Sequence, residues 1–230
     1  MNILILQEET MSELLHELND VRRGIMFVME APSGTGKTTV IKRLLAEDKH
    51  LNWSVSVTTR QPREGEVNGV DYYFVSDEEY DKLLKEDAFY ECVDSQYGCR
   101  YGTLRSEVDG FINVGKDVLF DMDWDGLRQL KEKAPNDVVS IYMLPPSVKE
   151  LRRRLEGRGT DSKETIDKRM NMLVDKMKHW VEYDYVLICD NPEQATLAIR
   201  RIFFAERMKR VRQTGLVEFT QKLVDEVKNS

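Results

Sequence analysis

Short runs of consecutive apolar residues, each bounded by polar or turn residues, recur along the chain and predict buried strands. They occupy residues 24–30 (GIMFVME), 53–57 (WSVSV), 117–123 (DVLFDMD), 137–144 (DVVSIYML) and 185–190 (YVLICD). Hydrophobicity within the runs is continuous rather than alternating, which is typical of strands buried on both faces of a parallel sheet. Helical stretches separate most of the runs, so the pattern predicts an α/β fold with an open, doubly wound sheet.

Apolar residues at spacings of four and three predict a helix in the C-terminal half of the chain. The members of this stripe are Ile166, Met170, Leu173, Met177 and Trp180. This spacing marks one face of a helix, and core packing explains the stripe better than a cofactor role does. Residues 192–228 predict one or two further amphipathic helices, and residues 12–23 predict a weak one.

Two segments interrupt the alternation of strands and helices. Residues 58–103 are richer in glycine, tyrosine and charge, and contain possible strands at DYYFV (71–75) and FYECV (89–93) and a small helix at 77–85. This composition predicts an inserted α+β lobe. The polar stretch EGRGTDSKET, residues 156–165, joins two helices and is typical of a mobile lid.

Composition narrows the range of partners and compartments. The chain of 230 residues carries 34 Lys and Arg against 41 Asp and Glu, a net charge of −7 that argues against a general nucleic-acid-binding surface. Three scattered cysteines argue against a disulfide framework and favour a reducing cytosol, and the pair Cys92 and Cys99 lacks neighbours at metal-ligand spacing. The start MNILIL is not typical of a signal peptide, and no run reaches the roughly 18 apolar residues of a membrane span. We therefore expect a cytoplasmic protein without a membrane partner.

The segment APSGTGKT, residues 31–38, follows the first predicted strand and opens a helix, as a phosphate-binding loop does. Its backbone N–H groups would surround phosphates at the helix N-terminus, where the dipole favours anions. Lys37 would reach the β- and γ-phosphates, and the Thr38 hydroxyl would help to hold Mg²⁺. A purely structural turn would explain the two glycines, but not a lysine and a threonine at these positions.

A second candidate anion site follows in SVTTRQPREGEVNGVDYYF, residues 56–74. Arg60 and Arg63 lie three apart around a proline, and Tyr72 follows in a short predicted strand. Two guanidinium groups and a phenol could bind a phosphate monoester through charge-assisted hydrogen bonds. A solvated charged loop is the alternative, and this segment alone does not decide between them.

Taken in order, several segments resemble the guanylate kinase family. They are APSGTGKT, SVSVTTRQPREGEVNGVDYYFVS, FYECV, YGT, LFDMDWDG and RLEGRGTD, which together span about residues 24–207. The resemblance implies a P-loop kinase core with a five-stranded parallel sheet flanked by helices, an inserted small α+β GMP-binding lobe and a helical lid. It implies transfer of the γ-phosphoryl group of ATP to GMP, giving ADP and GDP, with Mg²⁺ as cofactor, in purine nucleotide metabolism. ATP and GMP are then the expected partners of a monomer or homodimer.

The resemblance also implies a division of the chain. An N-terminal extension (1–23) precedes the guanylate kinase-like domain (24–207), and a C-terminal helical tail (208–230) follows it. Within the domain, the expected parts are a core (24–57 and 104–207), a GMP-binding lobe (58–103) and a lid (156–168).

The family motifs carry roles in GMP binding over to this sequence. The matched positions are Arg60, Arg63, Tyr72 and Tyr101 for the GMP phosphate, with Gly102 beside them, and Ser56, Glu91 and Thr103 for guanine. Guanine presents N1–H and a 2-amino group side by side, and the carboxylate of Glu91 can accept both hydrogen bonds. Adenine lacks this donor pair, so it would leave buried groups unpaired.

Asp121 and Asp123 stand at the end of a predicted buried strand, the edge of a parallel sheet where ligands bind. The resemblance implies that both face the active site, one serving guanine or ribose and the other acting on Mg²⁺ through water. For Asp123, an N-cap of the following helix is the alternative.

The same resemblance implies an ATP site and a set of catalytic cations. The expected ATP-binding residues are Ala31, Pro32, Ser33, Gly34, Thr35, Gly36, Lys37, Thr38, Thr39 and Arg154. Phosphoryl transfer requires cations that stabilise the charge on the transferred group, and Lys37, Arg60, Arg158 and Arg169 match these positions. For Arg154, an exposed helix residue is the alternative. No side-chain partner is evident for His16, His50 or His179, which we expect on the surface.

Three positions depart from the family pattern. Ala31 replaces the first glycine of the loop, which is tolerable if its φ stays negative. Asp125 stands where the family usually has glutamine, and Cys189 where it usually has an asparagine near the ATP base or ribose.

Two other functions remain as alternatives to a GMP kinase. A catalytically silent interaction module would tend to lose the phosphate-loop lysine and the lid arginines, which are present here. A kinase for another small phosphorylated acceptor would not need the guanine set Ser56, Glu91 and Thr103.

Overall fold

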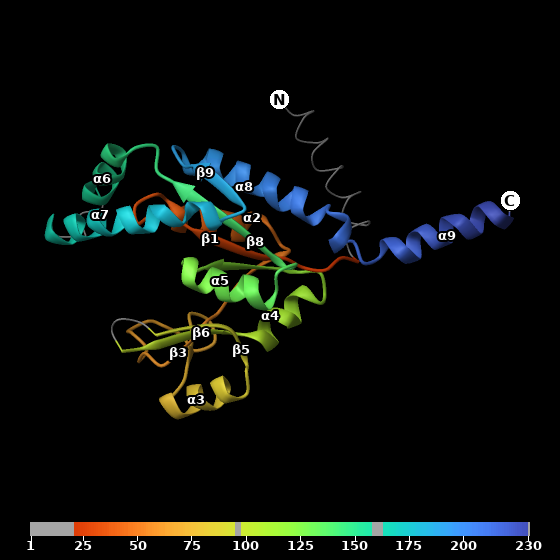
Figure 1. Ribbon diagram of the computed structural model, residues 1–230, viewed down its shortest axis with the longest axis horizontal. Coiled ribbons are helices and arrows are strands. Elements are labelled where there is room, and N and C mark those ends of the chain that lie inside the picture. Colours follow the sequence, from red (N-terminus) through yellow and green to blue (C-terminus); the bar gives the residue numbers. More distant parts are fainter. Residues whose placement is uncertain (1–20, 95–97, 158–162, 230) are drawn as a thin grey trace.

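The computed structural model describes residues 21–94, 98–157 and 163–229 of the chain. A five-stranded sheet in the order β2-β7-β1-β8-β9 forms its centre, and every neighbouring pair in it is parallel (Figure 1). The strands are β1 (Met26–Glu30), β2 (Leu51–Trp53), β7 (Asp117–Asp121), β8 (Val138–Leu144) and β9 (Tyr185–Ile188). The predicted five-stranded parallel sheet is therefore confirmed.

Strand β1 is buried on both of its faces. Phe27 and Met29 belong to one hydrophobic core and Met26 and Val28 to the other, and all four side chains are inaccessible to solvent. Helices α2 (Lys37–Glu47) and α8 (Pro192–Arg207) cover the first core, while α4 (Arg105–Ile112) and α5 (Trp124–Lys133) cover the second. This two-sided burial explains why the run in the sequence is continuously apolar.

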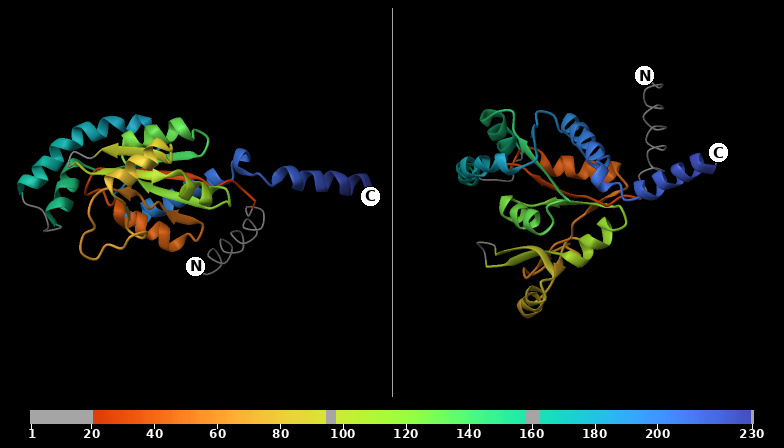
Figure 2. Two further views of the ribbon diagram at one scale, coloured as in Figure 1. Left: turned by 90° about the horizontal axis from the view of Figure 1, so that it is seen from below. Right: turned by 45° about the vertical axis from the view of Figure 1, so that its right-hand side comes forward.

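A second, smaller sheet forms the inserted lobe, on the side of α4 and α5 (Figure 2). Its order is β4-β3-β6-β5, and its strands are β3 (Val57–Thr58), β4 (Tyr73–Phe74), β5 (Phe89–Asp94) and β6 (Arg100–Leu104). Helix α3 (Asp77–Lys85) has the predicted bounds, because Ser76 and Glu79 form a capping box at its start. Tyr80 of this helix packs on Phe89, with ring centroids 4.8 Å apart.

The single strand predicted at residues 53–57 is wrong. Strand β2 ends at Trp53 in the main sheet, and Val57 begins β3 in the lobe sheet. Between them the Ser54 N–H still donates to the Leu119 carbonyl of the main sheet, whereas the Ser56 carbonyl accepts from Tyr73 of the lobe. The two serines therefore carry the chain from one sheet to the other. Strand β6 was not predicted at all.

Helices α6 (Val148–Gly157) and α7 (Lys163–Lys178) pack on each other through a separate apolar cluster. Ile166, Leu173 and the partly buried Met177 lie in it, as the predicted stripe requires. Trp180 does not, since it lies in the 3-10 helix η1 (His179–Glu182) with 47% of its surface exposed. The predicted polar break at 156–165 includes residues 158–162, which lie outside the described residues.

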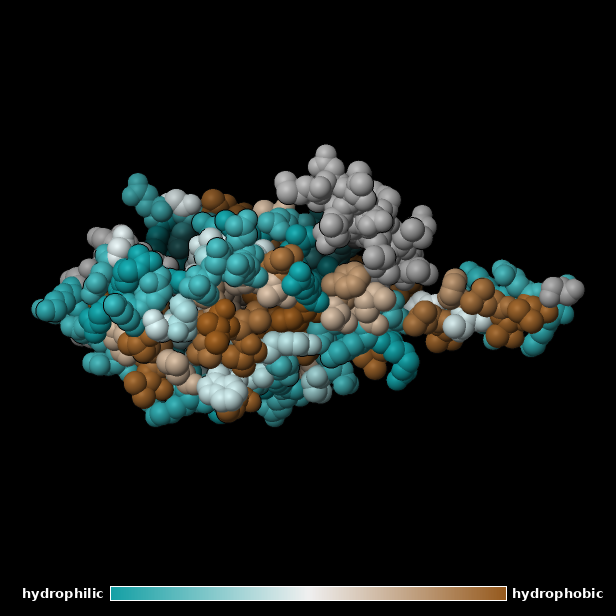
Figure 3. Space-filling view, turned by 90° about the horizontal axis from the view of Figure 1, so that it is seen from above, coloured by the Kyte–Doolittle hydropathy of each residue, from teal (hydrophilic) through white to brown (hydrophobic). Residues whose placement is uncertain are grey.

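The C-terminal region forms two helices, α8 and α9 (Leu216–Asn229), joined through the 3-10 helix η2 (Arg210–Arg212). Helix α9 extends away from the rest of the molecule, and apolar side chains run along its surface (Figures 1 and 3). No helix in the described part of the chain is long and apolar enough to cross a membrane. Of the weak helix predicted at 12–23, only residues 21–23 are described, and these are not helical.

A buried network of charges closes the end of the main sheet opposite the phosphate loop. Arg22 donates to both carboxylate oxygens of Asp117, at 2.6 and 3.0 Å. Arg207 donates to Asp117 and to Asp48, each at 2.7 Å. The network joins the start of the domain to β7 and to the end of α8.

Candidate active site

The loop between β1 and α2 has the geometry of a phosphate-binding loop. Gly34 and Gly36 adopt φ values of 93° and 112°, a left-handed region that glycine enters without strain. A Cβ at Gly34 would also approach Leu151 and Leu155 of α6 to 3.0 Å. Gly36 is the N-cap of α2, and within the described residues no side chain caps this end and no acidic residue occupies its first turn. The positive end of the helix dipole therefore faces an open anion site.

Ala31 can replace the first glycine of the loop, because its φ is not positive. Among the described non-glycine residues, only Asp87 has a positive φ, so the backbone at Ala31 is unstrained. Its methyl group is buried with Phe27 and Met29 in the main core. Ala31 therefore anchors the start of the loop to the core.

Lys37 and Thr38 stand in the first turn of α2, where the sequence predicts them. The Lys37 ammonium group forms an ion pair with Asp121 at the end of β7. Thr38 is exposed to solvent. Hydroxyl and carboxylate oxygens are the ligands that Mg²⁺ prefers, so Thr38 and Asp121 fit a magnesium ion held beside phosphates.

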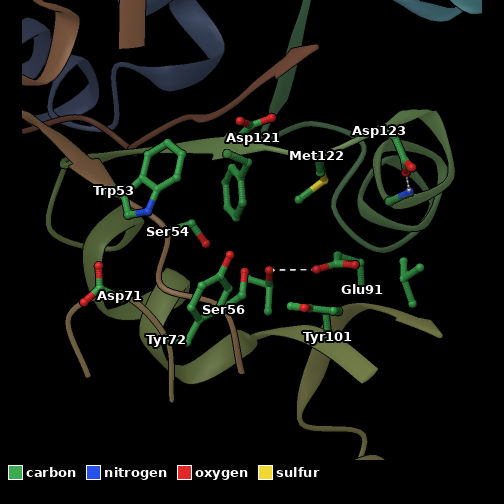
Figure 4. A pocket seen from close by; sticks show the side chains of 14 residues that line it. Trp53, Ser54, Ser56, Asp71, Tyr72, Glu91, Tyr101, Asp121, Met122 and Asp123 are labelled. Atoms are coloured by element: carbon green, nitrogen blue, oxygen red, sulfur yellow. Dashed lines mark hydrogen bonds between the residues drawn. The ribbon is translucent and has the colours of Figure 1, made fainter. Parts of the chain in front are cut away.

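A cavity of about 320 Å³ opens between the main sheet and the lobe. Figure 4 shows Asp121, Met122 and Asp123 on its upper side and Tyr72, Ser56 and Tyr101 on its lower side. The residues that line it are Trp53, Ser54, Ser56, Asp71, Tyr72, Glu91, Val93, Tyr101, Thr103, Phe120, Asp121, Met122, Asp123 and Gly126.

Glu91 is a buried hydrogen-bond acceptor in the wall of this cavity. The Thr103 hydroxyl donates to its Oε1 at 2.9 Å across strands β5 and β6 (Figure 4). Burial raises the pKa of Glu91 to about 7, the Thr103 hydrogen bond opposes that rise, and the negative charge of Asp123 adds to it. A carboxylate in this setting gains from a ligand that offers N–H donors.

The predicted phosphate-binding group is brought together only in part. The Tyr72 and Tyr101 rings meet edge to face at 5.9 Å, and the Arg60 guanidinium lies 5.2 Å above the Tyr72 ring. Glu66, which the sequence did not single out, accepts from Arg60 at 2.9 and 3.0 Å and from the Arg63 backbone N–H at 2.8 Å. The Arg63 side chain is exposed, and neither arginine lines the cavity.

Gly102 has a structural role behind the cavity wall. A Cβ at this position would come within 2.8 Å of the Phe89 ring and 3.1 Å of the Glu91 carbonyl. The absence of a side chain therefore allows β5 and β6 to approach closely enough to pair Glu91 with Thr103.

Asp121 and Asp123 both line the cavity, but from different settings. Asp121 is the last residue of β7, whereas Asp123 is the N-cap of α5 and accepts from the Gly126 N–H at 3.5 Å. The capping alternative for Asp123 is thus correct, and its carboxylate borders the cavity at the same time. Asp125, in the first turn of α5, is exposed and does not line the cavity.

The alternative of an exposed helix residue is wrong for Arg154. Its guanidinium donates to the carbonyl oxygens of Thr35, Cys189 and Asp190, at 3.1, 3.2 and 2.7 Å. Arg154 therefore ties the phosphate loop to the segment that follows β9. Of the other predicted cations, Arg158 and the side chain of Arg169 lie outside the described residues.

Several cavity residues were not predicted from the sequence, and the expectation was wrong for two histidines. Ser54 and Asp71 neighbour predicted residues, but nothing in the sequence distinguishes Trp53, Val93, Phe120 and Met122 from core residues. His179 has a partner after all: its Nδ1 lies 2.7 Å from Glu182, and its ring stacks on Trp124 at 4.1 Å. His50 is half-buried rather than exposed, and His16 lies outside the described residues.

The fold and the site together define a class of protein. A phosphate loop with lysine and threonine lies at the carboxyl edge of a parallel sheet, beside a cavity that holds a buried carboxylate. This combination is that of a P-loop kinase that acts on a small acceptor.

Comparisons with known proteins identify the family within this class. A family model described as guanylate kinase matches residues 23–206. The guanylate kinase of Zymomonas mobilis subsp. mobilis is 48% identical over 203 residues, covering 88% of this chain and 94% of that protein. That of Novosphingobium aromaticivorans is 48% identical, with 88% and 91% covered. A crystal structure of guanylate kinase from Anaplasma phagocytophilum matches with a TM-score of 0.67 and 34% identity, over 87% of this chain and 95% of that one.

The chain belongs to the guanylate kinase family, as its motifs predict. The family comprises nucleotide-binding kinases that convert ATP and GMP into ADP and GDP.

Proposed function

We propose that this chain transfers the γ-phosphoryl group of ATP to GMP, with GMP in the cavity between the two sheets and ATP at the phosphate loop. One observation carries the proposal: the buried pair Glu91 and Thr103 lines the same cavity as Asp121, which forms an ion pair with Lys37 of the phosphate loop. An acceptor base bound at Glu91 and Thr103 would direct its phosphate toward Lys37 and Asp121.

Guanine is read by Ser56, Glu91 and Thr103. The Glu91 carboxylate accepts from N1–H and the 2-amino group, while Thr103 orients it through the 2.9 Å hydrogen bond. Desolvation makes the carboxylate costly to leave unpaired, so a base without adjacent donors binds poorly. Asp121 and Asp123 line the same cavity, and one of them contacts guanine or ribose.

The GMP phosphate is held by Arg60, Arg63, Tyr72 and Tyr101, beside Gly102. Glu66 holds the Arg60 guanidinium close to the two tyrosine rings, so this group is oriented before the substrate arrives. Arg63 closes over the phosphate from the exposed edge of the lobe.

ATP is bound by the phosphate loop and by Arg154. The loop residues are Ala31, Pro32, Ser33, Gly34, Thr35, Gly36, Lys37, Thr38 and Thr39. Lys37 exchanges its partner Asp121 for the β- and γ-phosphates when ATP binds, which frees the Asp121 carboxylate. Arg154 holds the loop in shape through the Thr35 carbonyl.

Mg²⁺ is the cofactor that the site fits, with Thr38 as its direct protein ligand and Asp121 or Asp123 acting through water. When bound, it neutralises charge on the phosphates. Lys37, Arg60, Arg158 and Arg169 supply the remaining positive charge. The chain needs no general base, because the acceptor is already a phosphate oxyanion.

The proposal also covers the location, the metabolic role and the oligomeric state of the protein. We place the protein in the cytoplasm, in purine nucleotide metabolism, as a monomer or homodimer that binds ATP and GMP. The division into an extension (1–23), a domain (24–207) with its core, lobe and lid, and a tail (208–230) is part of the proposal. The family match at residues 23–206 supports the outer bounds of the domain.

Identification of the products tests this function. Incubation of the full chain with ATP, Mg²⁺ and GMP should give ADP and GDP in equal amounts, separated by anion-exchange chromatography. Release of ADP without GDP, or no reaction, would contradict the proposal.

A further inference from the structure

Glu30 is a buried carboxylate beside the phosphate loop that the roles above leave unused. It is the last residue of β1, directly before Ala31, and its side chain is 2% exposed. Buried carboxylates require partners. The Tyr183 hydroxyl donates to its Oε2, but Oε1 has no hydrogen-bond donor within the described residues.

The group that faces Glu30 is the side chain of Lys176 on α7. Its Nζ lies 3.7 Å from the Glu30 Oε1, close enough for an ion pair but too far for a hydrogen bond. The backbone carbonyl of Lys176 accepts a hydrogen bond of 3.0 Å from the Tyr142 hydroxyl. Lys176 is therefore held through both its side chain and its backbone.

Both groups that hold Lys176 come from paired positions in the main sheet. Glu30 of β1 lies opposite Tyr142 of β8 in the parallel register. Tyr183, which follows η1, completes the cluster, since its ring lies 4.9 Å from that of Tyr142 at an angle of 59°. Burial and the hydrogen bond to Glu30 raise the pKa of Tyr183, so its hydroxyl remains a donor. The cluster thus joins the central strands to the C-terminal end of α7.

The rest of α7 is packed differently. Its apolar face contacts α6 in a cluster separate from the two cores of the main sheet. Figure 1 shows α6 and α7 side by side beyond one end of the sheet. From Lys163 to Lys176 the helix spans about 20 Å, so a tilt of about 10° at Lys176 displaces the other end by about 3 Å. Arg169, a proposed catalytic residue, belongs to this part of the helix and would be displaced with it.

We propose that Glu30 is a positioning residue for phosphoryl transfer: with Tyr142 and Tyr183 it forms a pivot that fixes Lys176, and with it α7, to the strand that opens the phosphate loop. The inference rests on the proposed function, because it assigns α7 a role in that reaction. A long ion pair lacks the directionality of a hydrogen bond, so it holds the helix in place while allowing it to rotate. Glu30 acts through Lys176 and does not touch the substrates.

Two substitutions and a matched control test the pivot. Glu30→Gln keeps the size of the side chain and an acceptor for Tyr183, and Lys176→Met keeps the aliphatic stem on a side chain that is 40% exposed. Lys178→Met, two residues along the same helix, removes only the surface ion pair with Asp175. Steady-state kinetics gives kcat, intrinsic tryptophan fluorescence gives the Kd of GMP, and thermal unfolding reports folding.

The pivot predicts a loss of kcat without a loss of GMP binding. Each substitution should lower kcat by about tenfold, since a displacement of about 1 Å can cost more than that. The Kd of GMP should stay within about twofold, as should kcat of the Lys178→Met control. The double variant Glu30→Gln with Lys176→Met should be no slower than the slower single variant, because the two residues act as a unit. Lys176→Arg, which keeps the charge and adds reach, should restore kcat.

Three results would overturn the pivot. The first is kcat within twofold of the unchanged protein in both single variants. The second is a double variant in which the fold-losses of kcat of the two single variants multiply. The third is a lower melting temperature with unchanged kcat, which would mean that the residues have a structural role only. If Glu30→Gln fails to fold, the half-exposed Lys176→Met and its rescue by arginine decide the question. An unchanged protein that forms no GDP would refute the proposed function, whereas an active one with unaffected variants would refute the pivot alone.

Discussion

Replacing Glu91 by glutamine separates the energetic cost of burying this carboxylate from its use in binding guanine. Burial raises the pKa of Glu91 from 4.5 to about 7. A rise of about 2.5 pH units corresponds to about 3 kcal/mol at 1.36 kcal/mol per unit. Because the pKa is higher in the folded state, the associated stability is fully present below about pH 4.5 and is lost as the pH rises through about 7. Glutamine keeps the size of the side chain and an acceptor for Thr103, but it carries no charge.

Urea unfolding at two pH values measures this cost. At pH 5 the free energies of unfolding of the unchanged protein and of Glu91→Gln should differ by less than about 1 kcal/mol. At pH 8.5 the variant should be more stable by about 3 kcal/mol. Glu78→Gln, on the exposed side of α3, is the matched control and should change stability by less than about 0.5 kcal/mol at either pH.

Activity should move in the opposite direction. Without the carboxylate, guanine loses its paired acceptor, so kcat/KM for GMP should fall by at least about a hundredfold. A variant that is both more stable and less active is expected where a site is strained for function. A stability difference between the two proteins that does not depend on pH would mean that burying the Glu91 charge is not costly. A Glu91→Gln variant that is less stable than the unchanged protein at pH 8.5 would mean the same.

Three further substitutions probe other parts of the account. Lys37→Ala should lower kcat by about 10²- to 10³-fold while leaving the Kd of GMP within about twofold, and an unchanged kcat would exclude its role. Ala31→Gly should change the affinity for ATP, measured by calorimetry, by less than about tenfold, or about 1.4 kcal/mol, because Ala31 is unstrained; a larger gain would mean that the loop is impaired. Asp117→Asn should lower the free energy of unfolding by about 3–5 kcal/mol, because it leaves Arg22 buried without its charge partner and Arg207 with Asp48 alone. Glu47→Gln, which breaks a surface pair with Arg200, should cost less than about 1 kcal/mol in the same urea titration.

The parts of the fold that the sequence predicts well depend on local pattern. Strand β1 and helix α3 fall where expected, because burial on both faces leaves a continuous apolar run and a capping box marks a helix start. The phosphate loop is equally local, since its glycines, lysine and threonine are consecutive. The assignment of Glu91 and Thr103 to one site was reached through the family motifs rather than through local pattern, and their hydrogen bond was not predicted.

The parts that could not be predicted depend on contacts between distant residues. Nothing in WSVSV indicates that its first residue ends in one sheet and its last begins in another. The Arg154 side chain binds the Thr35 carbonyl 119 positions away, and no pattern along α6 reveals that contact. Glu30 reads as the polar end of an apolar strand, and its partners Lys176 and Tyr183 come from the far end of the chain.

The most direct test of the central claim is the ratio of kcat/KM for GMP to that for AMP, measured with saturating ATP and Mg²⁺. Recognition of guanine by the buried Glu91 and Thr103 predicts a ratio above about 10³, because adenine leaves the carboxylate unpaired. A ratio near one would contradict the account, since the cavity would then bind its acceptor through the phosphate alone.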